Sequence, residues 1–210
     1  MAGSRIRPAR LLLVGKAGAG KRTAASYLAE QYGFVRYNLL EKPTAVMRDL
    51  FPRFQDRGFQ DTDTEREMVT RVKDALQRVD PIVWAKELCR RIMAERPIRA
   101  VVIGDGISAA EEAYLTDRDY LCFRPIEVEC PDHVRALRLG VRPDQLEQAP
   151  SYLPPVARII IDNSGPWEAL AQHLDNVARD LSLEPVYVPL RILMESTAVQ
   201  AEFLRQREAK

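Results

Sequence analysis

A glycine-rich segment near the amino terminus combines residue types that together could bind a phosphate chain. It reads Gly15-Lys16-Ala17-Gly18-Ala19-Gly20-Lys21-Arg22-Thr23 and directly follows the apolar run Leu11 to Val14. Glycines let the backbone turn tightly, so that its N–H groups and the positive end of the following helix point at one anion, and Lys21 adds a mobile positive charge. The segment therefore predicts a loop that binds the phosphates of a nucleoside triphosphate.

The residues after this loop favour that interpretation over a chance flexible segment. Apolar side chains recur there at helical spacing, and Gly33 is placed to end the helix; the apolar positions are Ala25, Leu28, Ala29 and Tyr32. Arg22 departs from the general pattern, because a Ser or Thr at its position usually reaches Mg²⁺, and Thr23 brings a hydroxyl one place later. We expect the nucleotide to be bound by Gly15, Ala17, Gly18, Ala19, Gly20, Lys21, Arg22 and Thr23.

Polar side chains elsewhere could complete a site for phosphate chemistry. Asp105 follows an apolar run and could hold a metal ion, its water shell or an acceptor group. Arg135, Arg138 and Arg142 follow Cys130, and the last two are four residues apart on one helix face, so these arginines could form a solvated basic face. An acceptor could be bound after the second strand, where Arg36 and Arg48 could receive a phosphate or remain surface arginines; the candidates there are Arg36, Asn38, Lys42 and Arg48.

Five apolar runs of strand length must position these side chains. They are Leu11 to Val14, Phe34 to Tyr37, Ala100 to Gly104, Ile126 to Cys130 and Arg158 to Asp162, and patterns of helical length lie between them. Such alternation predicts an α/β fold with a parallel sheet covered on both faces, in three α/β/α layers. We expect the strand at Leu11 in the centre, between those at Ala100 and Ile126, with the ligand crevice at the carboxyl ends of the strands.

The helical patterns suggest one domain with an insertion and an appendage. Residues 1–185 form the predicted domain, residues 38–97 hold a helical insertion that could bind the substrate, and residues 186–210 form a carboxyl-terminal appendage. Capping boxes are predicted at Thr64 with Glu67 and at Ser108 with Glu111, and first helical positions at Pro81 and Pro166. Three apolar stripes are predicted to face the core: Met68, Val72, Leu76 and Val79; Trp84, Leu88 and Ile92; and Trp167, Leu170, Leu174, Val177 and Leu181.

Composition excludes several classes of function. The 31 Lys and Arg residues balance 30 Asp and Glu residues, so the net charge of +1 provides no general attraction for nucleic acid or an anionic membrane. The 3 cysteines form no CxxC pair, and 2 histidines cannot complete a common metal site. No apolar run approaches the roughly 20 residues of a membrane span, and the amino terminus lacks a signal-peptide core. We expect a cytoplasmic protein with a small-molecule partner and a possible homodimer.

Taken together, these segments resemble the P-loop nucleoside monophosphate kinases, most closely the phage-type deoxynucleoside monophosphate kinases, with dephospho-coenzyme A kinase as a relative. The resemblance covers roughly residues 10–181. The family also writes its loop Gly-Lys-x-x-x-Gly-Lys-x-Thr, which Thr23 matches. The segments from Phe34 to Pro43, from Asp80 to Trp84 and from Arg158 to Gly165 look like its second strand, its Asp-Pro-x-x-Trp helix start and its last strand and turn.

This resemblance implies ATP and Mg²⁺ as cofactors and phosphoryl transfer as the reaction. Lys21, Asp105, Arg138 and Arg142 would act in the transfer, Asn163 would lie beside the adenine, and Thr23 and Asp105 would serve the metal. The family also carries arginines that cover the triphosphate, and the resemblance offers Arg135, Arg138 and Arg142 for that role. The segment around Asp105 sits where these kinases carry Asp-Val-Arg-Phe-Pro-Asn-Glu. Asp105 and Glu111 match that motif, whereas Ile107 and Ala110 replace its arginine and asparagine.

Three functions therefore stay open from the sequence. The first is an ATP-dependent kinase of a (deoxy)nucleoside monophosphate or a similar phosphorylated acceptor, which the loop lysine favours. The second is a nucleotide-binding regulatory or interaction protein with little transfer activity, which Arg22, Ile107 and Ala110 favour. The third is an enzyme similar to dephospho-coenzyme A kinase.

Overall fold

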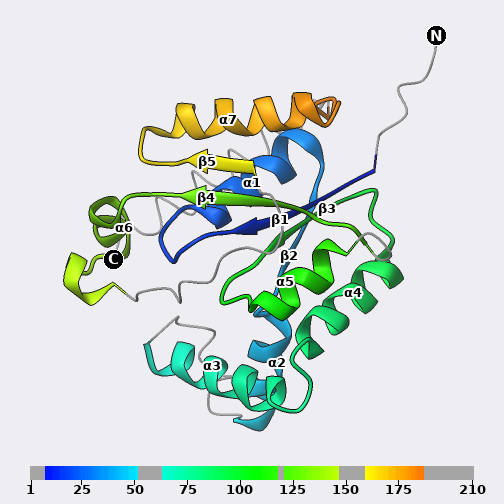
Figure 1. Cartoon of the computed structure of the whole chain (residues 1–210), viewed down its shortest axis with the longest axis vertical. Coiled ribbons are helices and arrows are strands. Elements are labelled where there is room, and N and C mark those ends of the chain that lie inside the picture. The colour runs from blue at the N-terminus through cyan, green and yellow to red at the C-terminus, as the bar shows by residue number, and fades with distance from the viewer. Residues whose placement is uncertain (1–7, 52–62, 118–120, 147–158, 187–210) are drawn as a thin grey trace, which may run out of the picture.

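The computed structural model describes residues 8–51, 63–117, 121–146 and 159–186 (Figure 1). Its centre is a five-stranded sheet in the order β2-β3-β1-β4-β5, and every pairing is parallel. The strands are β1 (Ala9–Val14), β2 (Val35–Asn38), β3 (Arg99–Ile103), β4 (Arg124–Glu129) and β5 (Ile159–Asp162). The predicted parallel sheet with the strand at Leu11 in its centre is thus confirmed.

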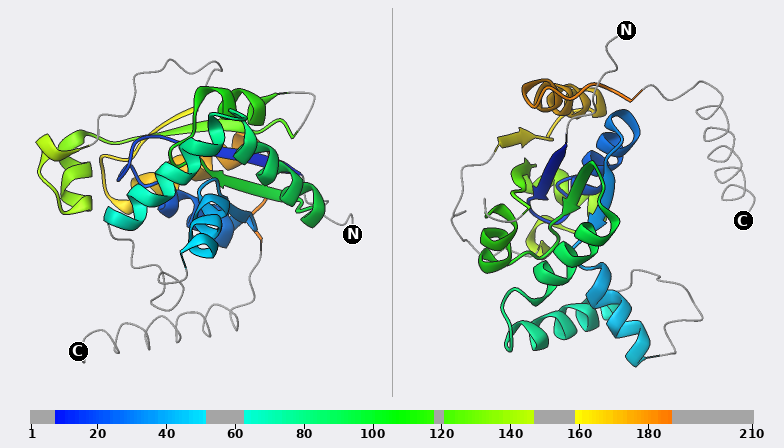
Figure 2. Two further views of the ribbon diagram at one scale, coloured as in Figure 1. Left: turned by 90° about the horizontal axis from the view of Figure 1, so that it is seen from below. Right: turned by 90° about the vertical axis from the view of Figure 1, so that its right-hand side faces the viewer.

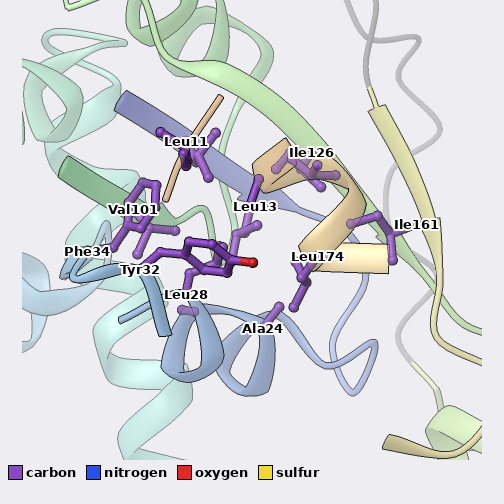
Figure 3. Packing of buried hydrophobic residues seen from close by; sticks show 14 of the residues in the cluster. Leu11, Leu13, Ala24, Leu28, Tyr32, Phe34, Val101, Ile126, Ile161 and Leu174 are labelled. Carbon is purple, nitrogen blue, oxygen red and sulfur yellow. The ribbon is translucent and has the colours of Figure 1, made fainter. Parts of the chain in front are cut away.

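Side chains of β1 alternate between two apolar layers. Leu11 and Leu13 belong to the buried cluster on one face, and Leu12 and Val14 belong to the cluster on the other. Successive side chains of a strand point to opposite faces, so a continuous apolar run indicates a strand covered on both sides. Figure 3 shows the first cluster, where Leu11, Leu13, Val101, Ile126 and Ile161 of the sheet meet Ala24, Leu28 and Leu174 of the covering helices.

Two pairs of helices cover the sheet. On one face lie α1 (Lys21–Tyr32) and α7 (Trp167–Asp180), and on the other lie α4 (Val83–Glu95) and α5 (Ala109–Thr116). The two views of Figure 2 show these layers from below and from the side. The helix α6 (Asp132–Leu139) follows β4. Within the described ranges, no helix combines the length and the apolar character needed to cross a membrane.

The segment between β2 and β3 contains α2 (Glu41–Leu50), α3 (Asp63–Gln77) and α4. The predicted apolar stripe of α3 is wrong, because Leu76 and Val79 are 41% and 84% exposed. The buried face of this helix is formed instead by Glu65, Val69 and Lys73, at helical spacing. The stripe of α4 is confirmed, since Trp84, Leu88 and Ile92 are all buried.

The structure confirms one of the two predicted capping boxes and places the two prolines outside their helices. Ser108 and Glu111 form the predicted capping box at α5, with both reciprocal hydrogen bonds present. Thr64 lies inside α3, one residue after its start at Asp63, so the prediction of Thr64 as the residue before the helix is wrong. Pro81 and Pro166 stand just before the first helical residues of α4 and α7, not at them.

The chain that leaves α7 returns to the end of α1. The Val186 N–H donates to the carbonyl of Gln31 at 2.8 Å, and the buried Arg99 donates to the carbonyls of Tyr32 and Glu184 at 2.5 and 3.0 Å. Apart from Val186, the predicted appendage of residues 186–210 lies outside the described residues.

Candidate nucleotide site

The loop between β1 and α1 takes a conformation that only glycine adopts easily. Gly15, Gly18 and Gly20 have φ angles of 133°, 76° and 105°. A Cβ on Gly15 would collide with the carbonyl oxygen of Val128, and a Cβ on Gly20 would collide with the side-chain amide of Asn163. Because Gly20 also precedes α1 without a capping side chain, the first N–H groups of this helix are left to a ligand.

Lys21 begins α1 and bends back over the loop. It is only 5% exposed, and its Nζ donates to the carbonyls of Gly15 at 2.8 Å and Lys16 at 3.0 Å. The same Nζ lies 3.0 Å from Oδ1 of Asp105, which follows β3. The sheet order places β3 beside β1, so the structure brings together the loop lysine and the carboxylate that sequence analysis singled out.

Asp105 contacts two cations. Its Oδ1 faces Lys21, and its Oδ2 lies 3.7 Å from Nη2 of Arg22. Direct Mg²⁺ coordination needs carboxylate oxygens free to face the ion, and Arg22 replaces the hydroxyl of the general pattern, so this donor set does not fit a directly bound magnesium. Thr23 is exposed on α1. Among the residues with described side chains, no group of three or more His, Cys, Asp or Glu could hold a metal ion.

Helix α6 contacts the loop through Arg135. Arg135 is 1% exposed, and its Nε donates to the carbonyl of Ala17 at 2.7 Å. Its Nη1 donates to Asp132 at 2.6 Å, and this hydrogen bond, with Lys16 nearby at 3.7 Å, lowers the pKa of the Asp132 carboxyl below its usual value. Arg135, one of the three arginines that the resemblance offers as a cover for the triphosphate, thus donates to the backbone of the loop.

The turn after β5 holds the other end of the loop. The Asn163 side-chain amide donates to the carbonyl of Ala19 at 2.7 Å, and the Asn163 backbone N–H donates to Glu129 at 2.8 Å. Arg138 of α6 donates to the Asn163 carbonyl at 3.0 Å, and its Nη1 lies 3.4 Å from the Cys130 sulfur. Asn163, for which the resemblance implies a place beside the adenine, thus contacts the loop directly, and Arg138 contacts Asn163. Arg142 is exposed and pairs with Asp144 at 3.0 Å.

The candidates for binding an acceptor are spread over β2 and α2. Asn38 is at the carboxyl end of β2, and its side-chain oxygen accepts from the Leu40 N–H at 2.8 Å. Arg36 is exposed and donates to Ser26 of α1 at 2.7 Å. Arg48 is half-buried on α2. Lys42 lines a hollow of about 310 Å³ between α2 and α4, together with Val83, Trp84, Lys86, Glu87 and Arg90.

A buried ion pair beside Asp105 was missed by sequence analysis. Lys73 of α3, 5% exposed, donates to the carbonyl of Gly106 at 2.6 Å and to Gln77 at 3.1 Å, and it lies 3.5 Å from Glu111 Oε2. Glu111 is fully buried, and its Oε1 has no hydrogen-bond partner within the described part of the chain. The capping box flagged Glu111, but no pattern distinguished Lys73 from the other charged residues of α3.

Comparison with known proteins agrees on the fold. No protein-family model and no curated protein sequence matches the chain. Among solved structures, TT1252 from Thermus thermophilus is 18% identical over 83% of this chain and 98% of its own, with a TM-score of 0.52. A sugar kinase from Janibacter sp. HTCC2649 is 17% identical over 84% of this chain and 96% of its own, with a TM-score of 0.50. The chain has the α/β fold typical of P-loop kinases, with sheet order 2-3-1-4-5.

Proposed function

We propose that this chain transfers the γ-phosphate of ATP to a small phosphorylated acceptor, such as a (deoxy)nucleoside monophosphate. The observation that carries this proposal is the position of Lys21, buried at the start of α1 inside a loop whose glycines all have positive φ angles. Backbone N–H groups, a helix amino terminus and a lysine together bind phosphates, and the strand order turns at this point to leave a crevice. The kinase fold supports the same reaction class.

The proposed reaction needs charge and alignment from the protein. An oxygen of the acceptor phosphate attacks the γ-phosphorus; its new P–O bond forms as the bond to the bridging oxygen breaks, and ADP leaves with that electron pair. A phosphate oxygen has no proton to lose, so this acceptor requires no general base. Lys21 would bind the β- and γ-phosphates, and Arg138 and Arg142 would approach from α6 and the residues that follow it.

The acceptor would lie between the loop and the insertion that contains α2 and α3. Asn38 stands at the strand end that faces this space, and Arg36, Lys42 and Arg48 are the cations proposed for the acceptor. Dephospho-coenzyme A carries a sugar hydroxyl as its acceptor, which would need a base. Because Asp105 is already paired with Lys21 at 3.0 Å, this contact favours a phosphate acceptor over that alternative.

A second candidate is a nucleotide-binding protein without transfer activity. The observation that favours it is Ile107, which packs against the apolar cluster at α4 and α5, where the kinases that this chain resembles have an arginine. In that case the loop would bind the nucleotide, and the insertion would contact a regulatory partner.

Two measurements separate these candidates. Calorimetry should show ATP binding by the parent and a loss of at least about tenfold in Lys21→Ala, because a charged contact to phosphate is removed. Lys86→Ala, an exposed lysine of α4, serves as the matched control and should bind like the parent. ADP release is then followed with nucleoside monophosphates and dephospho-coenzyme A as acceptors. Equal affinities of the parent and Lys21→Ala would remove the proposal, and binding without release by any acceptor would favour the regulatory protein.

A further inference from the structure

Arg22 stands beside the carboxylate that a magnesium ion would need. Lys21 Nζ lies 3.0 Å from one oxygen of Asp105, and Arg22 Nη2 lies 3.7 Å from the other. A Mg²⁺ ion entering here would have to displace at least one of these cations and would then lie close to both positive charges. Like charges at such distances repel strongly when they are partly shielded from water.

Exposure distinguishes the two cations. The side chains of Lys21 and Asp105 are 6% and 21% exposed, whereas that of Arg22 is 68% exposed. At 3.7 Å the contact of Arg22 is longer than a hydrogen bond. Its guanidinium can therefore turn to an anion at the mouth of the loop while Lys21 keeps Asp105 neutralised. A guanidinium can donate to two phosphate oxygens at once, which suits it to that position.

The ionised side chains that contact the loop, Asp105 or Asn163 are mainly cationic. In the described part of the chain they include the cations Lys16, Lys21, Arg22, Arg135 and Arg138 and the carboxylates Asp105 and Asp132. A triphosphate needs such charge because its own phosphates repel one another. Here protein side chains already supply it.

We propose that Arg22 provides the positive charge that magnesium supplies beside other phosphate-binding loops, so that this chain binds ATP as the metal-free anion. The inference rests on the proposed function, in which the loop binds a nucleoside triphosphate. It concerns binding and assigns Arg22 a direct contact with the phosphates. Asp105 then positions Lys21 and Arg22 before the nucleotide arrives.

Titration of ATP with and without the metal tests this role. The full chain is titrated calorimetrically with ATP in excess Mg²⁺ and in EDTA, and tripolyphosphate is used as a probe that lacks the base. The parent should bind ATP with dissociation constants within about threefold in the two buffers. Arg22→Ser should lose about tenfold or more in EDTA and regain affinity when Mg²⁺ is added, since the hydroxyl is restored to the position that serves the metal. Arg22→Lys should lose less, because it keeps the charge.

Asp105→Asn separates this inference from a magnesium site by the sign of its effect. If Asp105 only neutralises Lys21 and Arg22, its removal frees both cations, and ATP should bind at least as tightly in EDTA as it does to the parent. If Asp105 serves a metal, the variant should bind ATP more weakly than the parent in Mg²⁺, and that weaker binding would overturn the inference. Binding in Mg²⁺ at least as tight as that of the parent supports it. Arg71→Ser, on the exposed face of α3, is the control, and it should leave every affinity unchanged.

The possible failures are distinguishable. If the parent binds ATP about tenfold or more tightly in Mg²⁺ than in EDTA, the inference is overturned and the proposed function still stands. Absence of binding of both ATP and tripolyphosphate, in either buffer, removes the proposed function and the inference with it. Thermal melting of each variant checks its folding. Arg22→Gln replaces Arg22→Ser if the latter unfolds, and unchanged binding by this variant in EDTA also overturns the inference.

Discussion

At the scale of single residues, three polar side chains hold the loop and the residues next to Asp105. Asn163 and Arg135 donate to loop carbonyls, and Lys73 donates to the carbonyl of Gly106. All three side chains are at least 95% buried, so each satisfies its own polar atoms by donating to the backbone. Such contacts hold the backbone around the loop and Asp105 in place, which is the preorganisation that the proposed phosphoryl transfer would require.

Lys73→Met should destabilise the protein by about 3 kcal/mol, because Glu111 would lose the cation that lies 3.5 Å away inside the core. The free energy of unfolding in urea measures this effect. Arg71→Met on the exposed face of the same helix should change it by only about 0.5 kcal/mol or less. Combining Lys73→Met with Glu111→Gln should recover part of the loss. If Lys73→Met and Arg71→Met lowered the free energy of unfolding by similar amounts, the proposed importance of the buried ion pair between Lys73 and Glu111 would be contradicted.

At the scale of elements, a shared hydrogen bond joins α1 to α7. Asp175 Oδ1 of α7 accepts from the hydroxyls of Tyr27 at 2.6 Å and Tyr32 at 2.8 Å, and Tyr27 also packs edge-on against Trp167, with ring centroids 5.3 Å apart. Burial and then the hydrogen bond to Asp175 raise the pKa of Tyr32 to about 12, and the same causes raise the pKa of Tyr27. Both phenols are therefore kept neutral in the folded protein.

This contact predicts a loss of stability at alkaline pH. Below about pH 10 the phenols are neutral in both states, so their contribution to stability is fully present. As the pH rises from about 10 towards the folded-state pKa values, the unfolded chain loses these protons first and stability falls. Urea midpoints between pH 8 and about pH 11.5 should fall more steeply for the parent than for Tyr27→Phe/Tyr32→Phe. If the urea midpoints of the parent and the double variant fell equally steeply with pH, folding would not change the pKa values of the two phenols.

At the scale of the whole molecule, the strand order brings four distant segments to one place. The loop after β1, the turn after β3, the start of α6 after β4 and the turn after β5 all follow the carboxyl ends of parallel strands. In Figure 1 the loop side of the sheet and α6 lie on the left, and the insertion with α2 and α3 lies below. Lys73 of α3 donates to the carbonyl of Gly106 in the turn after β3, so the insertion contacts one of these four segments.

Truncation tests the prediction that residues 186–210 dock on the domain or on a second copy. A chain ending at Leu183 loses two hydrogen bonds, one from Arg99 to the Glu184 carbonyl and one from the Val186 N–H to the Gln31 carbonyl. Its free energy of unfolding should therefore fall by about 1–3 kcal/mol. A chain ending at Val186 keeps those contacts and is the matched control. Sedimentation velocity and urea unfolding of both, beside the full chain, separate docking from dimerisation. If the full chain and the chain ending at Val186 are equally stable monomers, docking of residues 187–210 is excluded.

The sequence by itself determined the loop, the five strands and the central place of β1. These features depend on local patterns: glycine spacing sets the turn between β1 and α1, continuous apolar runs such as Leu11 to Val14 indicate strands covered on both faces, and alternation with helices requires parallel pairing. Loop spacing singled out Lys21, the position after an apolar run singled out Asp105, and the family resemblance singled out Asn163 as candidate site residues. What each of them contacts could not be predicted in this way.

Only the tertiary structure decided those contacts, because they join residues far apart in the chain. Asn163 reaches Ala19 across 144 positions, and Arg135 reaches Ala17 across 118. The buried face of α3 was not predicted because it includes Lys73, a charged residue. Its charge is neutralised by partners outside this helix. Hydropathy patterns record how much side chains avoid water, and they carry no information about which distant partner makes burial of a charged group favourable.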